Sequence, residues 1–340
     1  MGRVVTFGEI MLRLAPNGYL RLFQESQLQA TFGGGEANVA VSLANFDVET
    51  TFVTKLPDHA IGQAAVNALR WFGVDTSMIV RGGERIGVYY LEKGASQRSS
   101  ICIYDRKHSA IQEAQPDDFD WDRIFEGADW FHFTGITPAL GENLVEICRE
   151  ACIAAHMHGV KISCDLNYRS KLWSRNQARA AMAELCKYVD VCIANEEDAK
   201  DIFGIEAKDS DIDEGKLNHL GYVAVARQLA ERFHFEKVAI TLRSSLSASD
   251  NDWAGMLYDG EKCYFSKSYH LHIVDRVGGG DSFSAGLIYA LRAGKDAQQA
   301  IDFAVAASAL KHSIEGDVNR VRVEEVERLA QGNGSGRVQR

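Results

Sequence analysis

Short apolar segments rich in β-branched residues alternate with helix-period segments along most of the chain. This alternation limits the possible folds more than any other feature of the sequence. The strand-like segments cover residues 4–9, 51–55, 130–134, 161–165, 189–194 and 237–242, and helical patterns cover 61–72 and 141–158. Another helix is expected to begin at Ser174, because Gln177 completes a capping box. Several of the strands are nearly continuous apolar runs, as strands buried on both faces require. The sequence therefore predicts an α/β fold, a three-layer α/β/α sandwich around a mostly parallel central sheet.

Two segments, 13–32 and 86–106, depart from this pattern because polar and apolar residues alternate in them with period two. Val88 and Tyr90 fall on one face, and Tyr89 and Leu91 on the other. This alternation is typical of strands with one solvated or ligand-facing side. We therefore expect a small discontinuous β lid over the carboxyl end of the main sheet. The core would comprise residues 1–12, 33–85 and 107–325, and residues 326–340 would form a flexible tail, since 332–336 has linker composition.

Composition excludes several classes of function. The chain has 340 residues with 37 Lys+Arg against 47 Asp+Glu, so its net charge is −10, which argues against a nucleic-acid partner. No apolar run reaches the ~18–20 residues of a membrane span, and the start lacks a signal-peptide pattern. We expect a cytoplasmic protein with seven reduced cysteines and no membrane partner. The acidic stretch at 209–213 is expected to be a solvated loop.

The run from residue 275 to 286 is the most informative for chemistry. Gly278, Gly279 and Gly280 directly precede a predicted helix that runs to about residue 293. Glycines at a helix start leave backbone N–H groups free to bind phosphate oxygens. The next residue, Asp281, either caps the helix or accepts the proton of an attacking hydroxyl while the amides hold a phosphoryl group. Neither G-x-x-x-x-G-K-[ST] nor G-x-G-x-x-G is present, which disfavours Walker-type nucleotidases and dehydrogenases.

Two motifs carry a family resemblance. Residues 33–40, Gly-Gly-Gly-Glu-Ala-Asn-Val-Ala, resemble the N-terminal GGxxxNxA signature of the ribokinase (PfkB) family of sugar kinases, and residues 275–286 resemble its C-terminal DTxGAGD signature. The resemblance extends over about residues 3–325. It implies a ribokinase-like fold and a kinase that uses ATP and Mg²⁺ to phosphorylate a primary hydroxyl of a sugar. Carried over by position, Asp281 is the general base and Gly278, Gly279 and Gly280 form the anion hole.

The cofactor residues follow from the same resemblance. Contacts to the nucleotide are expected from Asn195, Thr241, Arg243, Gly278, Gly280 and Ser308. The small-residue helix at 304–311 would be either a wall of the adenine pocket or ordinary packing on the sheet. The family's N-x-x-E motif ends here in Asp198, one methylene shorter, so the water-mediated metal contact of Asp198 stays open. Some relatives are activated by a monovalent cation, and the sequence leaves open whether this protein is activated in the same way. Arg276 stands where the family usually has threonine.

Two arginines suggest the substrate. Arg106 ends the second lid strand, and Arg169 follows the 161–165 strand. The planar guanidinium of arginine can form two parallel hydrogen bonds with a carboxylate. Neutral sugars have no carboxylate and do not need such a partner. With residues 134–138 and Tyr89, these arginines resemble the 2-keto-3-deoxygluconate kinase branch of the family. That resemblance implies a sugar-acid site formed by Gly34, Tyr89, Tyr104, Arg106, Ile136, Arg169 and Asp281.

The predicted function is therefore ATP-dependent phosphorylation of 2-keto-3-deoxygluconate at its 6-hydroxyl. The galactose-derived epimer is an open alternative, because the sequence does not fix the preference at C4. Another sugar kinase of the family, fructokinase-like or specific for a different acid sugar, is a second alternative, and a non-catalytic sugar sensor is a third. A homo-oligomer that pairs through the lid is also expected, since an exposed strand edge invites a second copy.

Overall fold

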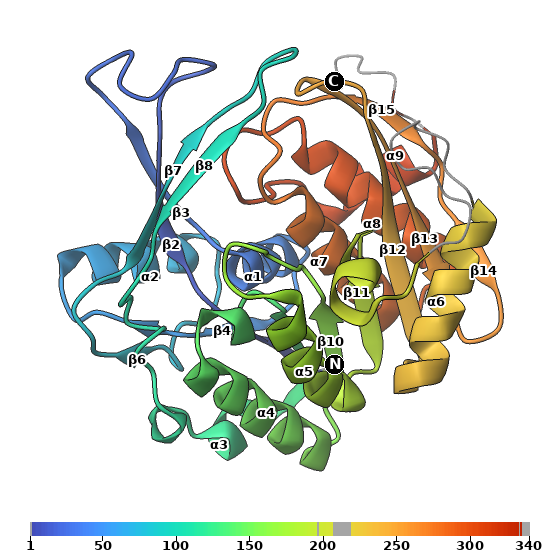
Figure 1. Ribbon diagram of the computed structural model, residues 1–340, viewed down its shortest axis with the longest axis horizontal. Helices are drawn as coiled ribbons and strands as arrows, with labels where there is room; N and C mark the ends of the chain where they lie inside the picture. Colours follow the sequence, from blue (N-terminus) through green and yellow to red (C-terminus); the bar gives the residue numbers. More distant parts are fainter. Residues whose placement is uncertain (1, 196, 207–218, 333, 335–340) are drawn as a thin grey trace.

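The computed structural model describes residues 2–195, 197–206, 219–332 and 334 (Figure 1). Within this part of the chain, a nine-stranded sheet has the order β14-β13-β12-β11-β10-β9-β1-β4, with β15 paired to β13. Its parallel strands are β1 (Arg3–Phe7), β4 (Thr50–Val53), β9 (Ala128–Thr134), β10 (Lys161–Asp165), β11 (Val191–Ala194) and β12 (Lys237–Ser245). An antiparallel edge follows, formed by β13 (Asp250–Tyr258), β14 (Cys263–Phe265) and β15 (Tyr269–His272).

Helices cover both faces of this sheet. The first layer contains α1 (Gly35–Asn45), α7 (Gly279–Arg292), α8 (Ala297–Lys311) and α9 (Val323–Ala330), and α2 (Ala60–Trp71) packs beside α1. The second layer contains α3 (Trp121–Phe125), α4 (Glu142–Met157), α5 (Arg175–Leu185) and α6 (His219–Phe233). Successive residues of β1 enter different cores: Val4 packs under the first layer, and Val5 under the second. This burial on both faces explains the continuous apolar runs, and the predicted α/β/α sandwich is confirmed.

A separate four-stranded sheet stands beside the central one (Figure 1). Its order is β3-β2-β7-β8, formed by β3 (Gln29–Gly33), β2 (Met11–Ala15), β7 (Gly87–Glu92) and β8 (Ile101–Asp105). The predicted alternation is present, because Tyr89 and Leu91 are buried while Val88 and Tyr90 are only partly so. The sheet is mixed rather than purely hairpin-built, since β2 and β7 pair in parallel. We refer to this sheet as the lid.

Several short elements complete the fold. A two-stranded ribbon joins β5 (Lys55–Leu56) and β6 (Val80–Arg81), 3-10 turns lie at Pro116–Asp118, Pro138–Leu140 and Cys186–Tyr188, and a π-helical turn lies at Ala199–Phe203. The capping box between Ser174 and Gln177 is formed as predicted. Among the described residues, no helix has the length and apolar character needed to cross a bilayer.

The end of the chain differs from the expectation of a tail from residue 326. Residues 326–330 belong to α9, and the side chain of Val326 is completely buried against α8 and its neighbours. Four of the eight residues of α9 are charged, so its composition resembles that of a solvated segment. Residues 333 and 335–340 of the expected tail, and the acidic stretch 209–213, lie outside the described residues.

Candidate active site

A cavity of about 1140 Å³ opens between the lid and the carboxyl ends of β10, β11 and β12. In open parallel sheets, ligands bind at this edge. The volume exceeds the roughly 300–1,000 Å³ of a typical pocket for one small ligand. The cavity therefore has room for two substrates side by side.

Most of the predicted site residues meet in this cavity. Its lining includes Gly34, Tyr89, Tyr104, Arg106, Ile136, Arg169, Asn195, Thr241, Arg243, Gly278, Gly280 and Asp281. These residues come from the lid, from the ends of the parallel strands and from the start of α7, so the fold brings together positions as far apart as 34 and 281. Gly279, Asp198 and Ser308 are not among the lining residues.

The glycine turn at the start of α7 has the shape of an anion site. Gly278 has φ +82°, and a Cβ there would collide with the carbonyl oxygen of Asp317, so this position requires glycine. In the part of the chain that the structure describes, no backbone acceptor outside α7 takes the N–H groups of Gly280 and Asp281. Free amides and the positive end of a 14-residue helix both favour a bound anion.

Ser308 lies behind this turn. Its side chain is completely buried, and its Oγ donates to the carbonyl oxygen of Gly279 at 2.7 Å. The side chain thus binds the main chain of the turn, and its contact with a nucleotide stays a prediction. Helix α8 packs closely on α7, with the Cα of Ala304 3.0 Å from the position of an ideal Cβ on Gly286.

Asp281 lies in the first turn of α7 and lines the cavity. Its Oδ2 accepts a hydrogen bond from Asn38 Nδ2 at 2.7 Å. Desolvation raises the pKa of Asp281 to about 6, although the hydrogen bond from Asn38 acts in the opposite direction. A carboxylate with this pKa is mostly ionised at neutral pH and still basic enough to accept a proton. Asn38 lies in the quoted GGxxxNxA motif, but the sequence alone gave it no role.

Two more carboxylates lie near Asp281. Burial, and then the charges of Asp198 and Asp281, raise the pKa of Asp165 well above its usual value. Both carboxylate oxygens of Asp198 accept hydrogen bonds from the main chain, from the N–H of Tyr168 at 2.9 Å and from the N–H of Asn195 at 3.1 Å. Of these two carboxylates, Asp165 lines the cavity and Asp198 does not.

Oxygen donors of this kind suit Mg²⁺, which keeps several waters and commonly uses only one or two carboxylates plus substrate phosphates. Among residues 2–195, 197–206, 219–332 and 334, no group of three or more His, Cys, Asp or Glu side chains is placed to hold a metal ion. Asp165 and Asp281 thus fit a hydrated Mg²⁺ that arrives with a nucleotide, and do not form a metal cage of their own.

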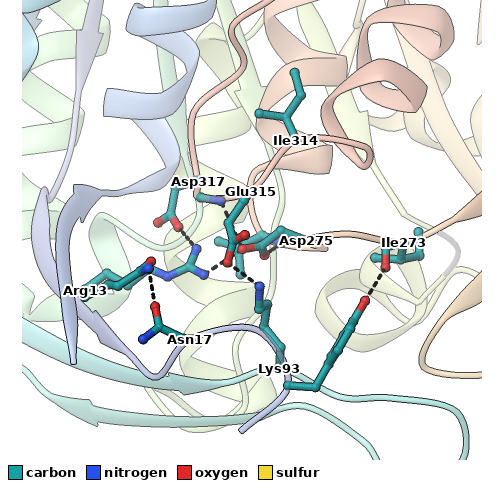
Figure 2. Close-up of polar contacts among 12 residues, drawn as sticks. Arg13, Asn17, Lys93, Ile273, Asp275, Ile314, Glu315 and Asp317 are labelled. Atoms are coloured by element: carbon teal, nitrogen blue, oxygen red, sulfur yellow. Dashed lines mark hydrogen bonds and ion pairs between the residues drawn. The ribbon is translucent and has the colours of Figure 1, made fainter. Parts of the chain in front are cut away.

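Ion pairs join the lid to the loops beside the glycine turn. Arg13 of β2 lies between Asp275, at 2.6 Å from Nη2 to Oδ2, and Asp317. Tyr89 also donates to Asp317, and Lys93 pairs with Glu315. Figure 2 shows Arg13 and Lys93 reaching from the lid toward these carboxylates. Sequence reasoning missed this set, because nothing in the local sequence connects residue 13 with residues 275 and 317.

The two predicted carboxylate-binding arginines have different surroundings. Arg106 is buried and donates through Nε and Nη2 to Oε2 of Glu9, the Nε bond being 2.8 Å long. Arg169 is exposed, and its Nη1 donates to the carbonyl oxygen of Tyr168 at 3.0 Å. No ion pair joins Arg169 to a carboxylate within the described ranges. Arg169 therefore has most of its donors available for a ligand, whereas Nε and Nη2 of Arg106 are engaged by Glu9, and the binding of a sugar carboxylate by the two arginines stays a prediction.

The far half of the cavity also carries positive charge. Burial and the neighbouring Arg243 lower the pKa of Arg276, whose Nη2 donates to Oδ1 of Asn251 at 3.2 Å. Arg243 and Arg276 both line the cavity next to Gly278. Two guanidinium groups this close repel each other unless an anion lies between them, so this half is suited to a polyphosphate.

Comparisons with known proteins agree with this geometry. Residues 1–321 match the model of the pfkB family carbohydrate kinases. The chain is 34% identical to the 2-dehydro-3-deoxygalactonokinase of Haloferax volcanii over 98% of both chains, and 27% identical to the 2-dehydro-3-deoxygluconokinase of Thermoproteus tenax over 92% of this chain and 89% of the relative. The crystal structure of the 2-dehydro-3-deoxygluconokinase of Thermotoga maritima superposes with a TM-score of 0.94 and 50% identity, covering 97% of this chain and 98% of that one.

Family, fold and cavity therefore agree, and the resemblance of the two glycine motifs is confirmed over nearly the whole chain. The chain belongs to the pfkB family of carbohydrate kinases and is a sugar kinase close to the 2-dehydro-3-deoxy-sugar kinases.

Proposed function

We propose that this kinase transfers the γ-phosphoryl group of ATP to the 6-hydroxyl of 2-keto-3-deoxygluconate, which is also named 2-dehydro-3-deoxygluconate. The observation that carries the proposal is the charge pattern of the cavity. An exposed guanidinium, Arg169, lines the same cavity as a glycine turn with a basic carboxylate, Asp281. A linear sugar acid presents the matching pattern, a carboxylate at one end and a primary hydroxyl at the other.

In this mechanism, Asp281 accepts the proton of the 6-hydroxyl as the oxygen attacks the γ-phosphorus. Asn38 holds the carboxylate in position through its hydrogen bond. The N–H groups of Gly280 and Asp281 face the charge that develops on the transferred group, and they need no reorganisation during the step. Asn195, Thr241, Arg243 and Gly278 complete the nucleotide side of the cavity. Asp165 and Asp281 would hold Mg²⁺ through its waters, and the ion would supply neutralisation of phosphate charge.

The sugar is held mainly from the other half. Arg169 forms a bidentate pair with the carboxylate, and Nη1 of Arg106 adds a donor from the lid. Tyr89, Tyr104, Gly34 and Ile136 border the same space. The rings of Tyr104 and Tyr89 are tilted toward each other with centroids 6.0 Å apart, and with sugar bound they would shield the reacting hydroxyl from water. If the site closes only over the sugar, hydrolysis of ATP without sugar is limited.

The test is an ADP-release assay with Mg-ATP and five acceptors: 2-keto-3-deoxygluconate, its galactonate epimer, fructose, ribose and gluconate. The proposal expects the highest kcat/KM with a 2-keto-3-deoxy acid, and phosphorus NMR of the product should place the phosphate on C6. A higher kcat/KM with fructose or ribose would refute the carboxylate argument. Sugar binding by calorimetry without any ADP release would favour the sensor alternative.

The epimer at C4 is the second candidate substrate. The 34% identity to a 2-dehydro-3-deoxygalactonokinase over nearly the full chain supports its inclusion. Because the two sugars differ only in the direction of one hydroxyl, the ratio of their kcat/KM values measures the C4 preference directly.

We also propose that the chain forms a homo-oligomer through the lid. Strand β8 is an edge of the small sheet, and it exposes Ile101, Ile103 and Tyr104, with Ile103 50% exposed. A second copy would cover these side chains and pair the free edge. Light scattering should report a dimer or larger assembly for the wild type and a monomer for Ile103→Lys. A monomeric wild type at all concentrations would refute the proposal.

A further inference from the structure

A buried lysine lies directly behind the glycine turn. Lys311 is the last residue of α8, and its side chain is completely buried. Its Nζ donates to the carbonyl oxygens of Ile314 at 3.1 Å and of Asp275 at 3.5 Å. In the described part of the chain, no ion pair joins this ammonium to a carboxylate. Main-chain oxygens therefore take the place of water around a charge that would otherwise be costly to bury.

These carbonyls belong to two loops that border the active site. The first loop, 273–278, leads into the glycine turn, and the second, 312–317, carries Glu315 and Asp317, the acceptors of the lid contacts. The loops are joined by hydrogen bonds from the N–H of Val274 to the carbonyl oxygen of His312 at 2.8 Å, and from the N–H of Gly316 to Oδ2 of Asp275 at 3.1 Å. Figure 2 shows Asp275 and Ile314 on these two neighbouring loops.

The stem of Lys311 also contacts the turn itself. Its Cε lies 3.2 Å from the position that a Cβ would occupy on Gly278. Gly278 is the residue whose left-handed conformation directs the following amides into the cavity. A shift of this side chain would therefore move the first residue of the anion hole.

We infer that Lys311 is a positioning residue for phosphoryl transfer: its ammonium acts as a tethered cation that holds the two loops together and fixes the Gly278–Gly280 turn. The inference rests on the kinase activity and goes beyond the proposed substrate. Burial lowers the pKa of Lys311, while the charges of Asp275 and Asp317 oppose this shift and favour the ammonium form. A consequence is that the wild-type enzyme needs no added monovalent cation, because the positive charge is already covalently present.

The experiment compares two variants that lack the charge but differ in the space they leave. Lys311→Ala removes the side chain beyond Cβ and leaves a cavity the size of propylammonium, whereas Lys311→Met fills most of that space with an uncharged chain. Both should lose about 100-fold in kcat with little change in the KM of the sugar, the size of effect seen when one preorganised donor is lost. Propylammonium should restore part of the lost kcat in Lys311→Ala and none in Lys311→Met. Tetramethylammonium at equal ionic strength is the control, because it is too bulky for the cavity.

Each result of this experiment either supports or overturns the role of Lys311. Wild-type kcat in Lys311→Met overturns the inference, and so does a folded Lys311→Ala that propylammonium does not rescue, since a merely structural lysine would behave in this way. A requirement of the wild type for added potassium overturns it as well. If Lys311→Ala does not fold, a Lys311→Met variant with low kcat and unchanged thermal midpoint supports it. If 2-keto-3-deoxy acids are not substrates, the proposed function fails separately, and the rescue is measured with the sugar that the enzyme does phosphorylate.

Discussion

The two halves of the cavity are built in different ways. The phosphoryl half is centred on one contiguous segment, 275–286, in which main-chain amides at the start of α7 provide the binding groups and Asp281 the base, and residues such as Thr241 and Arg243 add to it from β12. The sugar half consists of side chains from distant parts of the chain: Arg106 pairs with Glu9, and Arg13 with Asp317, 304 positions away. Among the described residues, the amides of Gly280 and Asp281 in the first half have no backbone acceptor outside α7, whereas Arg106 and Arg13 in the second half are already paired with carboxylates.

This difference has a consequence for ligand binding. A phosphoryl group entering the first half gains hydrogen bonds from amides that lose none, so the half is preorganised for its ligand. A sugar acid entering the second half gains most from Arg169, because the guanidinium of Arg106 is shared with Glu9. Substitutions in the first half should therefore reduce kcat, and substitutions in the second should mainly raise KM.

The largest effect is expected from Asp281→Asn. The amide keeps the size of the side chain and can still contact Asn38, but it cannot accept the proton of the hydroxyl. We expect kcat to fall by about 10³-fold or more, near the upper part of the range for general bases, with the KM of the sugar changed little. ADP release under saturating substrates measures this. If kcat falls less than tenfold in a folded variant, Asp281 is not the base, and the phosphoryl half works by positioning alone.

A smaller effect is expected from Arg169→Ala in the sugar half. Loss of one charge-assisted contact should raise the KM for 2-keto-3-deoxygluconate and lower kcat/KM by about 10–100-fold, while the thermal midpoint stays the same, because Arg169 is exposed. Arg169→Lys should recover part of the loss, since lysine keeps the charge but not the fork.

Arg106→Ala is the matched comparison for Arg169→Ala. It should lower the thermal midpoint as well as kcat/KM, because it leaves Glu9 buried without its partner. Equal midpoints for the two variants would contradict the distinction between a free and a paired arginine.

The same difference explains what the sequence could and could not predict. The glycine turn, Asp281 and the strand ends were predictable because a local pattern of residues determines them: three glycines before a helix, or an apolar run before a polar residue. The pairing of Arg106 with Glu9 and the position of Arg13 were not predictable, because they depend on contacts between segments that are distant in the chain. The hydrogen bond of Ser308 to Gly279 was not predictable for a related reason, since a small polar residue in a helix gives no sign of whether it faces a ligand or the main chain of its neighbour.

The pH dependence provides a test of the phosphoryl half alone. Asp281 must be ionised to accept a proton, and its pKa is raised to about 6 by desolvation. Activity should therefore be lost as the pH falls through this value, with kcat/KM at pH 5 about tenfold below its plateau. A profile from pH 4.5 to 9 measures this, with the concentration of the coupling enzymes varied as a control. An acid limb centred near pH 4 would mean that the carboxylate is better solvated than its position in the cavity indicates.

The smallest effect is expected from Glu36→Gln, at the junction of the two halves. Oε1 of Glu36 accepts hydrogen bonds from the N–H of Thr134 at 2.9 Å and from the hydroxyls of Thr134 and Thr137 at 2.8 and 2.7 Å. Burial nevertheless raises its pKa from 4.5 to about 7. The native state thus holds a proton that the unfolded chain releases near pH 4.5, so this group favours folding at low pH and loses that contribution as the pH rises through 7.

Glu36→Gln should remove this dependence of folding stability on pH. The thermal midpoint of the wild type should fall by a few degrees more than that of the variant between pH 5.5 and 8.5, while kcat stays within about twofold, since Glu36 is not in contact with the reacting groups. Glu142→Gln, an exposed position at the start of α4, is the matched control and should leave the wild-type slope unchanged. If Glu36→Gln instead lowers kcat strongly at an unchanged midpoint, Glu36 acts on the anion site through α1, and the two halves of the cavity are coupled rather than independent.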